Sequence, residues 1–367
     1  MRINNMNSLN FKRKIKIIDA HTHDKPFNKL GLKADSDDIL KFLNKPMQSQ
    51  NTKDTFVVTK MFPSSLDCCF MKQPDIKPYA DEIKGNEAIL KTFEGTKVKE
   101  FLAVCQPKTG SVDNIRQLFK NNPDKFIGLK FHPEGLELEA DSELYDSYLQ
   151  FAKEKNIPCL FHSDRTNNHT YPDGTVVAKS KYSTPEQIYN LAKRHPDVPV
   201  VMAHFGGPEK EDIEAAVDVI MKGAKNNDAK LYADLSWVDI DNYTEGKRKM
   251  QNIIDAIKKL KNSPFGDLTN RIMFGTDAPI DRFNQKDAQN TYENYIKDIY
   301  SAIKKSFGSE ADNIADNIFY KNANNLFFQN TAKKLLKTKG IIAAIVTGVL
   351  ACGGIGILIY NKCQNKK

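Results

Sequence analysis

Short apolar runs alternate with polar, amphipathic stretches along most of this chain. Eight runs are rich in β-branched and aromatic residues, which is typical of buried strands. They are Lys16–Asp19, Thr55–Met61, Phe101–Cys105, Ile127–Phe131, Pro158–Phe161, Val198–Ala203, Lys230–Leu235 and Arg271–Phe274. Apolar residues recur at helical spacing between them, in Ser142–Glu154, Pro185–Arg194, Glu209–Lys222 and Arg248–Leu260, while the helix after the second strand is poorly defined. Eight strands alternating with helices predict an α/β fold, a (β/α)8 TIM barrel over residues 15–330.

One segment near the C-terminus has a different pattern. Gly340–Tyr360 contains no charged residue, and lysines flank it on both sides. A helix of this length spans about 30 Å, the thickness of a bilayer core. We therefore predict a single transmembrane helix at 340–360, set off by a lysine-rich junction at 331–339 and a short basic tail at 361–367, and we read residues 1–14 as a flexible basic leader. A buried core helix is the alternative interpretation.

The same segment indicates a location and an oligomeric state. Lysines are slightly denser on its N-terminal side and no export signal precedes the body, so we expect a membrane-anchored protein whose catalytic domain is cytoplasmic. Small residues recur every four positions, at Gly340, Ala344 and Gly348 and onward. Such a stripe lets two membrane helices approach closely, so a homo-oligomer is a further hypothesis.

Charge and cysteine content narrow the class of protein. The net charge is +8, but seven lysines and no acidic residue follow residue 330, which leaves the body at +1. Because the body has no basic stripe interleaved with aromatic residues, we do not expect nucleic acid as a partner. The six cysteines form no CxxC pair, a pattern typical of reduced cysteines rather than of disulfides or a zinc finger.

The candidate chemistry lies at the ends of the predicted strands. His21 and His23 follow the first run, and they share one face because side chains alternate along a strand. Later runs end in His162, His204 and Asp277. Any one of them could be an ordinary core or loop residue. Together, at the face where barrel enzymes place their active groups, they predict a nitrogen and oxygen ligand set suited to zinc or a similar divalent ion.

The ordered motifs resemble a known superfamily. IDAHTH, GLKFHP, PCLFHSD, RHPDVPVVMAHFGG, LYADLSW and RIMFGTDAP are similar to the amidohydrolase superfamily, in its amidohydrolase-related branch of hydrolases and non-oxidative decarboxylases. The resemblance runs from about Ile15 to Phe328 and implies a distorted TIM barrel. It also implies metal ligation by His21 and His23 from strand 1, His162 from strand 5 and Asp277 from strand 8. His204, on strand 6, would either contact a second metal or hydrogen-bond the reacting water and the substrate.

Strand 4 leaves two interpretations open. Lys130 and His132 share a face. In binuclear members of the superfamily a strand-4 lysine is carboxylated and bridges two metal ions, whereas in the mononuclear members that this chain resembles, Lys130 would be a cation that pairs with substrate or with a site carboxylate. We favour one essential ion, zinc with manganese as the alternative. A purely structural ion pair of Lys130 also stays open.

The ligands suggest a mechanism. A divalent ion with an open position lowers the pKa of bound water to about 7. Asp277 can take the water's proton and deliver it to the leaving group, His204 can polarise a carbonyl, and Lys130 completes the catalytic candidates. We expect Lys130, His132, Arg165 and Asp234 to bind substrate.

Three hypotheses about function result. The first is a metal-dependent hydrolase of a small ester, lactone or amide. The second is a non-oxidative decarboxylase that uses the same site, since a fold and a ligand set do not decide the reaction. The third is a catalytically silent, membrane-tethered barrel. Barrel stability does not require five metal-competent groups at the strand ends, so the sequence argues against the third.

Overall fold

The computed structural model describes residues 13–24, 40–48, 53–69, 71–72, 77–78, 80–163, 169–170, 176–177, 182–207, 209–236, 243–278 and 288–328. The chain divides into two units, residues 1–324 and 325–367. The first unit holds the barrel, and the described part of the second, 325–328, is helical. The predicted membrane segment at 340–360, with its junction and tail, lies outside the described residues. Of the helices that the structure describes, none is long and apolar enough to span a bilayer.

Eight parallel strands form the barrel, and each predicted strand is confirmed. They are β1 (Lys14–His23), β3 (Thr55–Ser64), β6 (Phe101–Val104), β7 (Phe126–Phe131), β8 (Cys159–Phe161), β11 (Pro199–Met202), β12 (Lys230–Asp234) and β13 (Ile272–Met273). The last six pair in the order β6-β7-β8-β11-β12-β13, and β1 pairs with β3. The apolar runs are nearly continuous because helices cover the outer face of a parallel sheet.

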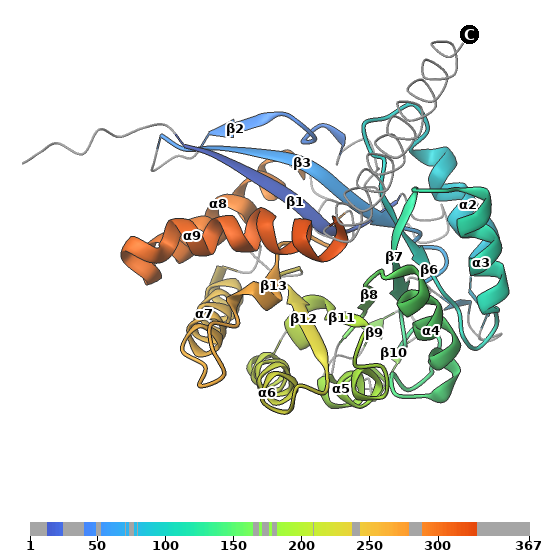
Figure 1. Cartoon of the computed structure of the whole chain (residues 1–367). Helices are drawn as coiled ribbons and strands as arrows, with labels where there is room; N and C mark the ends of the chain where they lie inside the picture. The colour runs from blue at the N-terminus through green and yellow to red at the C-terminus, as the bar shows by residue number, and fades with distance from the viewer. Residues whose placement is uncertain are drawn as a thin grey trace, which may run out of the picture. The chain divides into compact units, whose positions relative to one another are not determined.

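Helices surround these strands in Figure 1. They are α2 (Glu82–Thr92), α3 (Val112–Asn121), α4 (Asp146–Lys155), α5 (Pro185–Arg194), α6 (Lys210–Asn226), α7 (Tyr243–Lys261), α8 (Ala288–Phe307) and α9 (Ala311–Asp316). The poorly defined helix after the second strand is α2, which begins where the Asp81 carboxylate accepts hydrogen bonds from two backbone N–H groups. A capping box between Thr184 and Gln187 starts α5.

The last strand returns to the first, and this contact closes the barrel on the side of the predicted site. Thr22 bridges to Ala278, and the N–H of Ala20 donates to the carbonyl of Phe274 at 3.1 Å. The register of β1 against β3 shifts twice, between Ile17 and Ile18 and again between Asp19 and Thr22. Such irregularities redirect side chains, and the second one spans the position of His21. On the other side, β3 and β6 are neighbours in different sheets, so the barrel is distorted.

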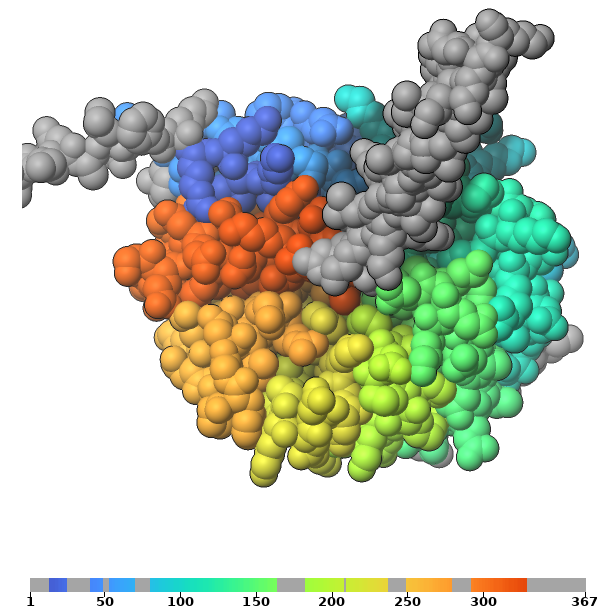
Figure 2. All heavy atoms as spheres, in the orientation of Figure 1, coloured from blue at the N-terminus to red at the C-terminus, as the bar shows by residue number. Residues whose placement is uncertain are grey.

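The C-terminal part of the first unit packs against the N-terminal strands. Figure 2 shows the blue N-terminal segment directly against the orange segment around residue 310, and the Arg13 guanidinium lies 2.7 Å from the Asp312 carboxylate. A π-helical turn, η7 (Asn317–Lys321), presents the Ile318 carbonyl to the N–H of Phe274 at 2.9 Å. The Asn322 amide donates to the carbonyls of Thr269 and Ile272. These bonds hold β13 in place although it is only two residues long.

Five short strands were not predicted. β2 (Pro46–Gln48) adds antiparallel to β3, while β4 (Met71–Lys72) pairs with β5 (Lys77–Pro78) and β9 (His169–Thr170) with β10 (Val176–Val177). The last two pairs lie in the loops that follow β3 and β8. Two-residue strands carry no alternation pattern, so the sequence could predict only a polar loop there.

Candidate active site

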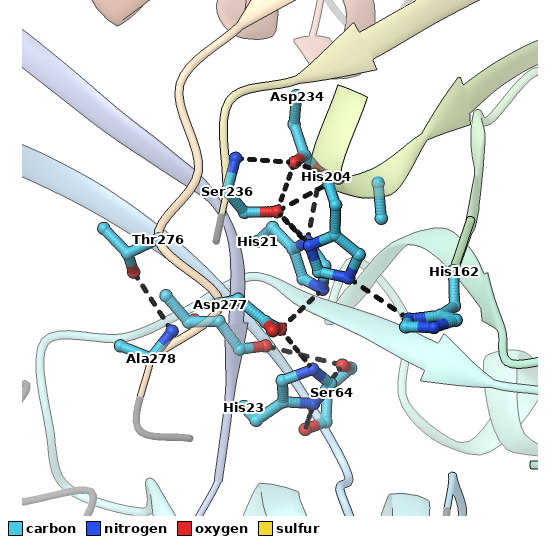
Figure 3. A network of polar contacts seen from close by, with 12 residues as sticks. His21, His23, Ser64, His162, His204, Asp234, Ser236, Thr276, Asp277 and Ala278 are labelled. Carbon is cyan, nitrogen blue, oxygen red and sulfur yellow. Dashed lines mark hydrogen bonds and ion pairs between the residues drawn. The ribbon is translucent and has the colours of Figure 1, made fainter. Parts of the chain in front are cut away.

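Two histidines at the carboxyl end of β1 approach the same carboxylate. The Nε2 atoms of His21 and His23 lie 3.1 Å and 3.0 Å from Oδ1 of Asp277, which follows β13 (Figure 3). All three side chains are buried. The structure thus brings together three of the five predicted ligands, from the first and the last strands of the barrel.

The second nitrogen of each ring is held by a neighbour. Nδ1 of His21 lies 3.0 Å from Oδ2 of Asp234, and Nδ1 of His23 lies 3.3 Å from the backbone carbonyl of Ser64 and 3.0 Å from its hydroxyl. A carboxylate and a carbonyl only accept hydrogen bonds, so these partners favour the proton on Nδ1 in both rings. The Nε2 atom of each ring then faces the Asp277 oxygen.

Both carboxylate oxygens of Asp234 accept hydrogen bonds from neighbouring residues of the site. Its Oδ1 accepts hydrogen bonds from the backbone N–H of His204 at 3.0 Å and of Ser236 at 2.9 Å, as well as from the Ser236 hydroxyl, while Oδ2 accepts from His21. The residue is 0% exposed. The sequence predicts that Asp234 binds substrate. The structure engages both of its oxygens inside the protein, with the ring of His21 and the backbone of His204 among the donors, and the predicted substrate role stays a prediction.

His204 follows β11 in an unusual backbone conformation. Four successive residues, 204–207, have positive φ, and His204 and Phe205 are not glycines (φ 58° and 53°). The turn directs the His204 ring into the site, where Ser236 Oγ lies 2.8 Å from Nδ1. Nε2 lies 3.1 Å from Nδ1 of His162. Backbone strain of this kind concentrates at functional sites.

His162 lies at the edge of the cluster. Its Nε2 is 3.4 Å from Oε2 of Glu134, and its ring stacks on His132 with centroids 4.0 Å apart. Among the described residues, two groups of three candidate ligand atoms lie within 4.8 Å of one another, namely His21, His23 and Asp277, and His21, His204 and Asp234. His162 belongs to neither, so its predicted ligand role stays a prediction.

Lys130 is a buried cation at the centre of the site. It is 1% exposed, and its Nζ lies 2.8 Å from Nε2 of His21. Burial lowers the pKa of Lys130. The alternation that places Lys130 and His132 on one face thus sends the first to the histidine pair and the second to His162. Both were predicted to bind substrate, and both lie at the site. Arg165, the fourth predicted substrate ligand, lies outside the described residues.

Burial sets the charges of the remaining groups. It lowers the pKa of His23 to about 4 and that of His204 well below its usual range, so both rings are neutral at pH 7. For Asp277, burial alone would raise the pKa, but His21 and His204 beside it hold the pKa well below the usual value. A carboxylate and neutral imidazoles are the protonation states that bind metal ions.

Three buried residues of the site were not singled out from the sequence. They are Asp19, Ser64 and Glu134. Asp19 has one sequence signal, because it precedes His21 by two positions on the same strand. Glu134 likewise follows the predicted pair of strand 4 by two positions. Ser64 is a common residue type in loops, and only its contacts reveal it. Ser236 ends the seventh predicted strand, and the sequence allows it to line the pocket or to cap the next element.

The donor set fits a divalent cation. Two Nε2 atoms and a carboxylate oxygen converge at 3.0 to 3.1 Å, close enough for one ion to contact all three. Two histidines with one carboxylate, each ring fixed by a hydrogen bond at its other nitrogen, are typical of metal sites. The Lys130 ammonium supplies positive charge beside His21. A bound ion and this ammonium would repel, so metal binding requires the Lys130 ammonium to move away from Nε2 of His21.

Fold and site together define a TIM-barrel enzyme whose chemistry lies at the carboxyl ends of its strands. A family model described as amidohydrolase matches residues 99–329. The chain therefore belongs to the amidohydrolase family, as its motifs indicate. His21 and His23 precede the matched region, and the structure places them at the site. None of the curated proteins searched matches this chain.

Solved structures share the barrel at low sequence identity. A probable 2-pyrone-4,6-dicarboxylic acid hydrolase from Acinetobacter baumannii is 15% identical, with 85% of this chain and 98% of that chain covered at a TM-score of 0.52. An amidohydrolase from Burkholderia multivorans is 10% identical with the same coverage and a TM-score of 0.54. A 2,6-dihydroxybenzoate decarboxylase from Rhizobium is 14% identical, again with the same coverage, at a TM-score of 0.50. At such identities the likeness establishes the fold and leaves the reaction open.

Proposed function

We propose that this chain is a metal-dependent hydrolase that cleaves a small ester, lactone or amide with one divalent ion, zinc or manganese. The observation that carries the proposal is the convergence of His21 Nε2, His23 Nε2 and Asp277 Oδ1, with each ring held at its other nitrogen. In such a site a divalent ion supplies a water molecule whose pKa is lowered towards neutrality.

The chain's own residues provide the proton transfers. Asp277 is a carboxylate at neutral pH, because its neighbours hold its pKa well below the usual value. It can accept a proton from the attacking water and return it to the leaving group. The Lys130 ammonium can donate to the carbonyl oxygen of the substrate and balance the negative charge that develops there. His204 is a neutral ring whose Nδ1 faces the Ser236 hydroxyl oxygen, so it can donate from Nε2 only after it takes up a proton.

Metal content tests the proposal. We would purify the full-length chain, reconstitute it with Zn²⁺ or Mn²⁺, and measure bound metal by plasma mass spectrometry. We expect about one equivalent per chain, and its loss in the double variant His21→Ala/His23→Ala. His195→Ala is the matched control, because Nε2 of His195 pairs with Asp146 at the end of α5, away from the strand ends. No metal above the double variant would refute the proposal, and about two equivalents would favour a bridged site with a modified Lys130.

A decarboxylase is the second candidate, and Lys130 is the observation that favours it. A buried ammonium whose Nζ lies 2.8 Å from Nε2 of His21 suits a substrate that carries a carboxylate. Assays would separate the two reactions. Release of CO₂ from an aromatic or unsaturated acid, without uptake of water into the product, would identify the decarboxylase, whereas cleavage of an ester, lactone or amide would identify the hydrolase.

We further propose that residues 340–360 anchor the barrel to a membrane. The proposal rests on the uncharged stretch and its flanking lysines. Carbonate extraction of membranes from expressing cells tests it, with a chain ending at residue 339 as the comparison. Recovery of the full-length chain in the soluble fraction would refute the anchor.

A further inference from the structure

Asp19 is a buried carboxylate on β1 that the proposed reaction does not use. It is 0% exposed and lies two residues before His21. Three donors meet on it. The backbone N–H of Thr276 donates at 3.0 Å, the Thr276 hydroxyl at 2.7 Å, and the hydroxyl of Tyr292 on α8 at 2.8 Å. One carboxylate therefore joins the first strand, the loop after the last strand and the helix that follows it.

Thr276 connects this carboxylate to the active site. Its hydroxyl donates to Asp19 and also accepts a hydrogen bond from the N–H of Ala278 at 3.2 Å (Figure 3). Asp277 lies between the two bonded residues. It has a φ of 61°, a left-handed conformation that non-glycine residues rarely adopt. Its N–H donates to the backbone carbonyl of His21 at 2.7 Å. The backbone is thus fixed before, at and after Asp277.

This fixed backbone decides where the Asp277 carboxylate points. A left-handed residue persists only where its surroundings hold it, and it relaxes when the holding contacts are removed. Relaxation would rotate the side chain away from Nε2 of His21 and His23, which it now approaches at 3.1 Å and 3.0 Å. We propose that Asp19, Thr276 and Tyr292 form a clamp that positions Asp277 for metal binding and proton transfer. The inference rests on the proposed function, and the three are positioning residues.

The same helix offers a matched control for the clamp. The hydroxyl of Tyr300, also on α8, donates a hydrogen bond to Oδ2 of the partly buried Asp54 at 2.7 Å. Asp54 lies just before β3, at the amino end of the strands, opposite to the site. Tyr292 and Tyr300 are 0% and 1% exposed. Replacing either by phenylalanine removes one tyrosine-to-aspartate hydrogen bond from α8, but only the Tyr292 bond belongs to the clamp.

The test compares four variants of the full-length chain, Thr276→Val, Thr276→Ser, Tyr292→Phe and Tyr300→Phe. Zn²⁺ affinity is measured by competition with a chromophoric chelator, and Tm by circular dichroism. Outer partners of metal ligands typically contribute about 10- to 100-fold in affinity, so we expect that loss in Thr276→Val, a smaller loss in Tyr292→Phe, and recovery in Thr276→Ser, which restores the hydroxyl. Tyr300→Phe should lower Tm about as Tyr292→Phe does and leave Zn²⁺ affinity unchanged.

Two outcomes would overturn the clamp. Equal Zn²⁺ affinities in Thr276→Val and the wild type would do so, as would equal losses in Tyr292→Phe and Tyr300→Phe. If Thr276→Val does not fold, the tyrosine pair decides. If the wild type binds no Zn²⁺, the proposed function fails and crystal structures of the metal-free wild type and Tyr292→Phe decide on the clamp. The clamp predicts that Oδ1 of Asp277 moves away from Nε2 of His23 in the variant, and an unchanged distance would refute it.

Discussion

Replacing Asp234 by asparagine should damage the site without changing its shape. The amide oxygen can still accept from the N–H groups of His204 and Ser236. The amide nitrogen then faces Nδ1 of His21, where a carboxylate oxygen lay at 3.0 Å. Because this nitrogen only donates, His21 must accept at Nδ1 and carry its proton on Nε2. That proton points at Asp277 and Lys130 and occupies the lone pair that a metal ion needs.

The expected loss of metal affinity follows from the reversal of one hydrogen bond, the one between Asp234 and Nδ1 of His21. Loss of such an outer partner costs about 10- to 100-fold in metal affinity, which equals about 1.4 to 2.7 kcal/mol. The three bonds to the other oxygen survive, so we expect the fold to be kept and Tm to fall only moderately. A charged acceptor is lost as well, and hydrogen bonds to charged groups contribute about 1.5 to 3 kcal/mol to the free energy of unfolding, which accounts for the expected fall in Tm.

The assay is Zn²⁺ affinity of full-length Asp234→Asn, measured by chelator competition beside circular dichroism. Asp218→Asn is the control. Its carboxylate pairs with Lys259 at 2.7 Å on the outside of α6, and its side chain is 63% exposed. The control makes the same chemical change and should bind Zn²⁺ like the wild type. A folded Asp234→Asn with wild-type affinity would refute the argument that the carboxylate fixes the His21 tautomer.

Three other perturbations test separate parts of the structure. Asp277→Asn should keep the fold and lower kcat by about 10²- to 10⁴-fold on any ester or lactone that the wild type hydrolyses, because an amide cannot accept the proton; wild-type turnover would contradict this. In the metal-free protein, burial lowers the pKa of His23 to about 4. The unfolded chain takes up a proton on this residue below about pH 6.5 and the folded protein does not. The free energy of unfolding, measured by urea titration, should therefore fall by about 2 kcal/mol between pH 7 and pH 5. A His23→Gln variant should lack that part of the pH dependence, and an identical slope would show that other groups cause it. Gly207→Ala should lower the free energy of unfolding by about 1 to 3 kcal/mol, because φ is +143° and the new Cβ would lie 2.5 Å from Oδ2 of Asp212. Gly266→Ala is the control, since φ is +98° there and the space around it is open, so it measures the backbone strain alone.

Periodicity predicted the barrel, because each strand is a local apolar run that helices cover. Strand ends also indicated the candidate site, since His21 and His23 lie at the end of β1 and His204 and Asp277 follow β11 and β13. The residue that follows an apolar run can be identified from the sequence alone, without knowledge of distant contacts. The closing strand β13 shows the limit of the method, because it is two residues long and depends on bonds from η7 and Asn322.

The contacts that orient the site were not predictable, because they join distant positions. Asp19 and Thr276 are 257 residues apart, and His23 and Ser64 are 41 residues apart. Neither serine nor aspartate at such positions differs from the same residue in a surface loop until register and twist bring the partners together. The substrate-binding role of Asp234 was inferred from residue type and position and stays a prediction, whereas its contacts inside the protein became visible only in the structure.

The left-handed turn at residues 204–207 affects how this enzyme should be probed and redesigned. Few side chains tolerate that conformation, and histidine and asparagine are among those found there more often than most. Alanine scanning would therefore misreport His204, because alanine removes the imidazole and adds backbone strain in the same step. Asparagine is the better truncation for isolating the ring's contribution. Libraries aimed at new substrates would keep more folded members if they left these four positions alone and diversified the neighbouring loops.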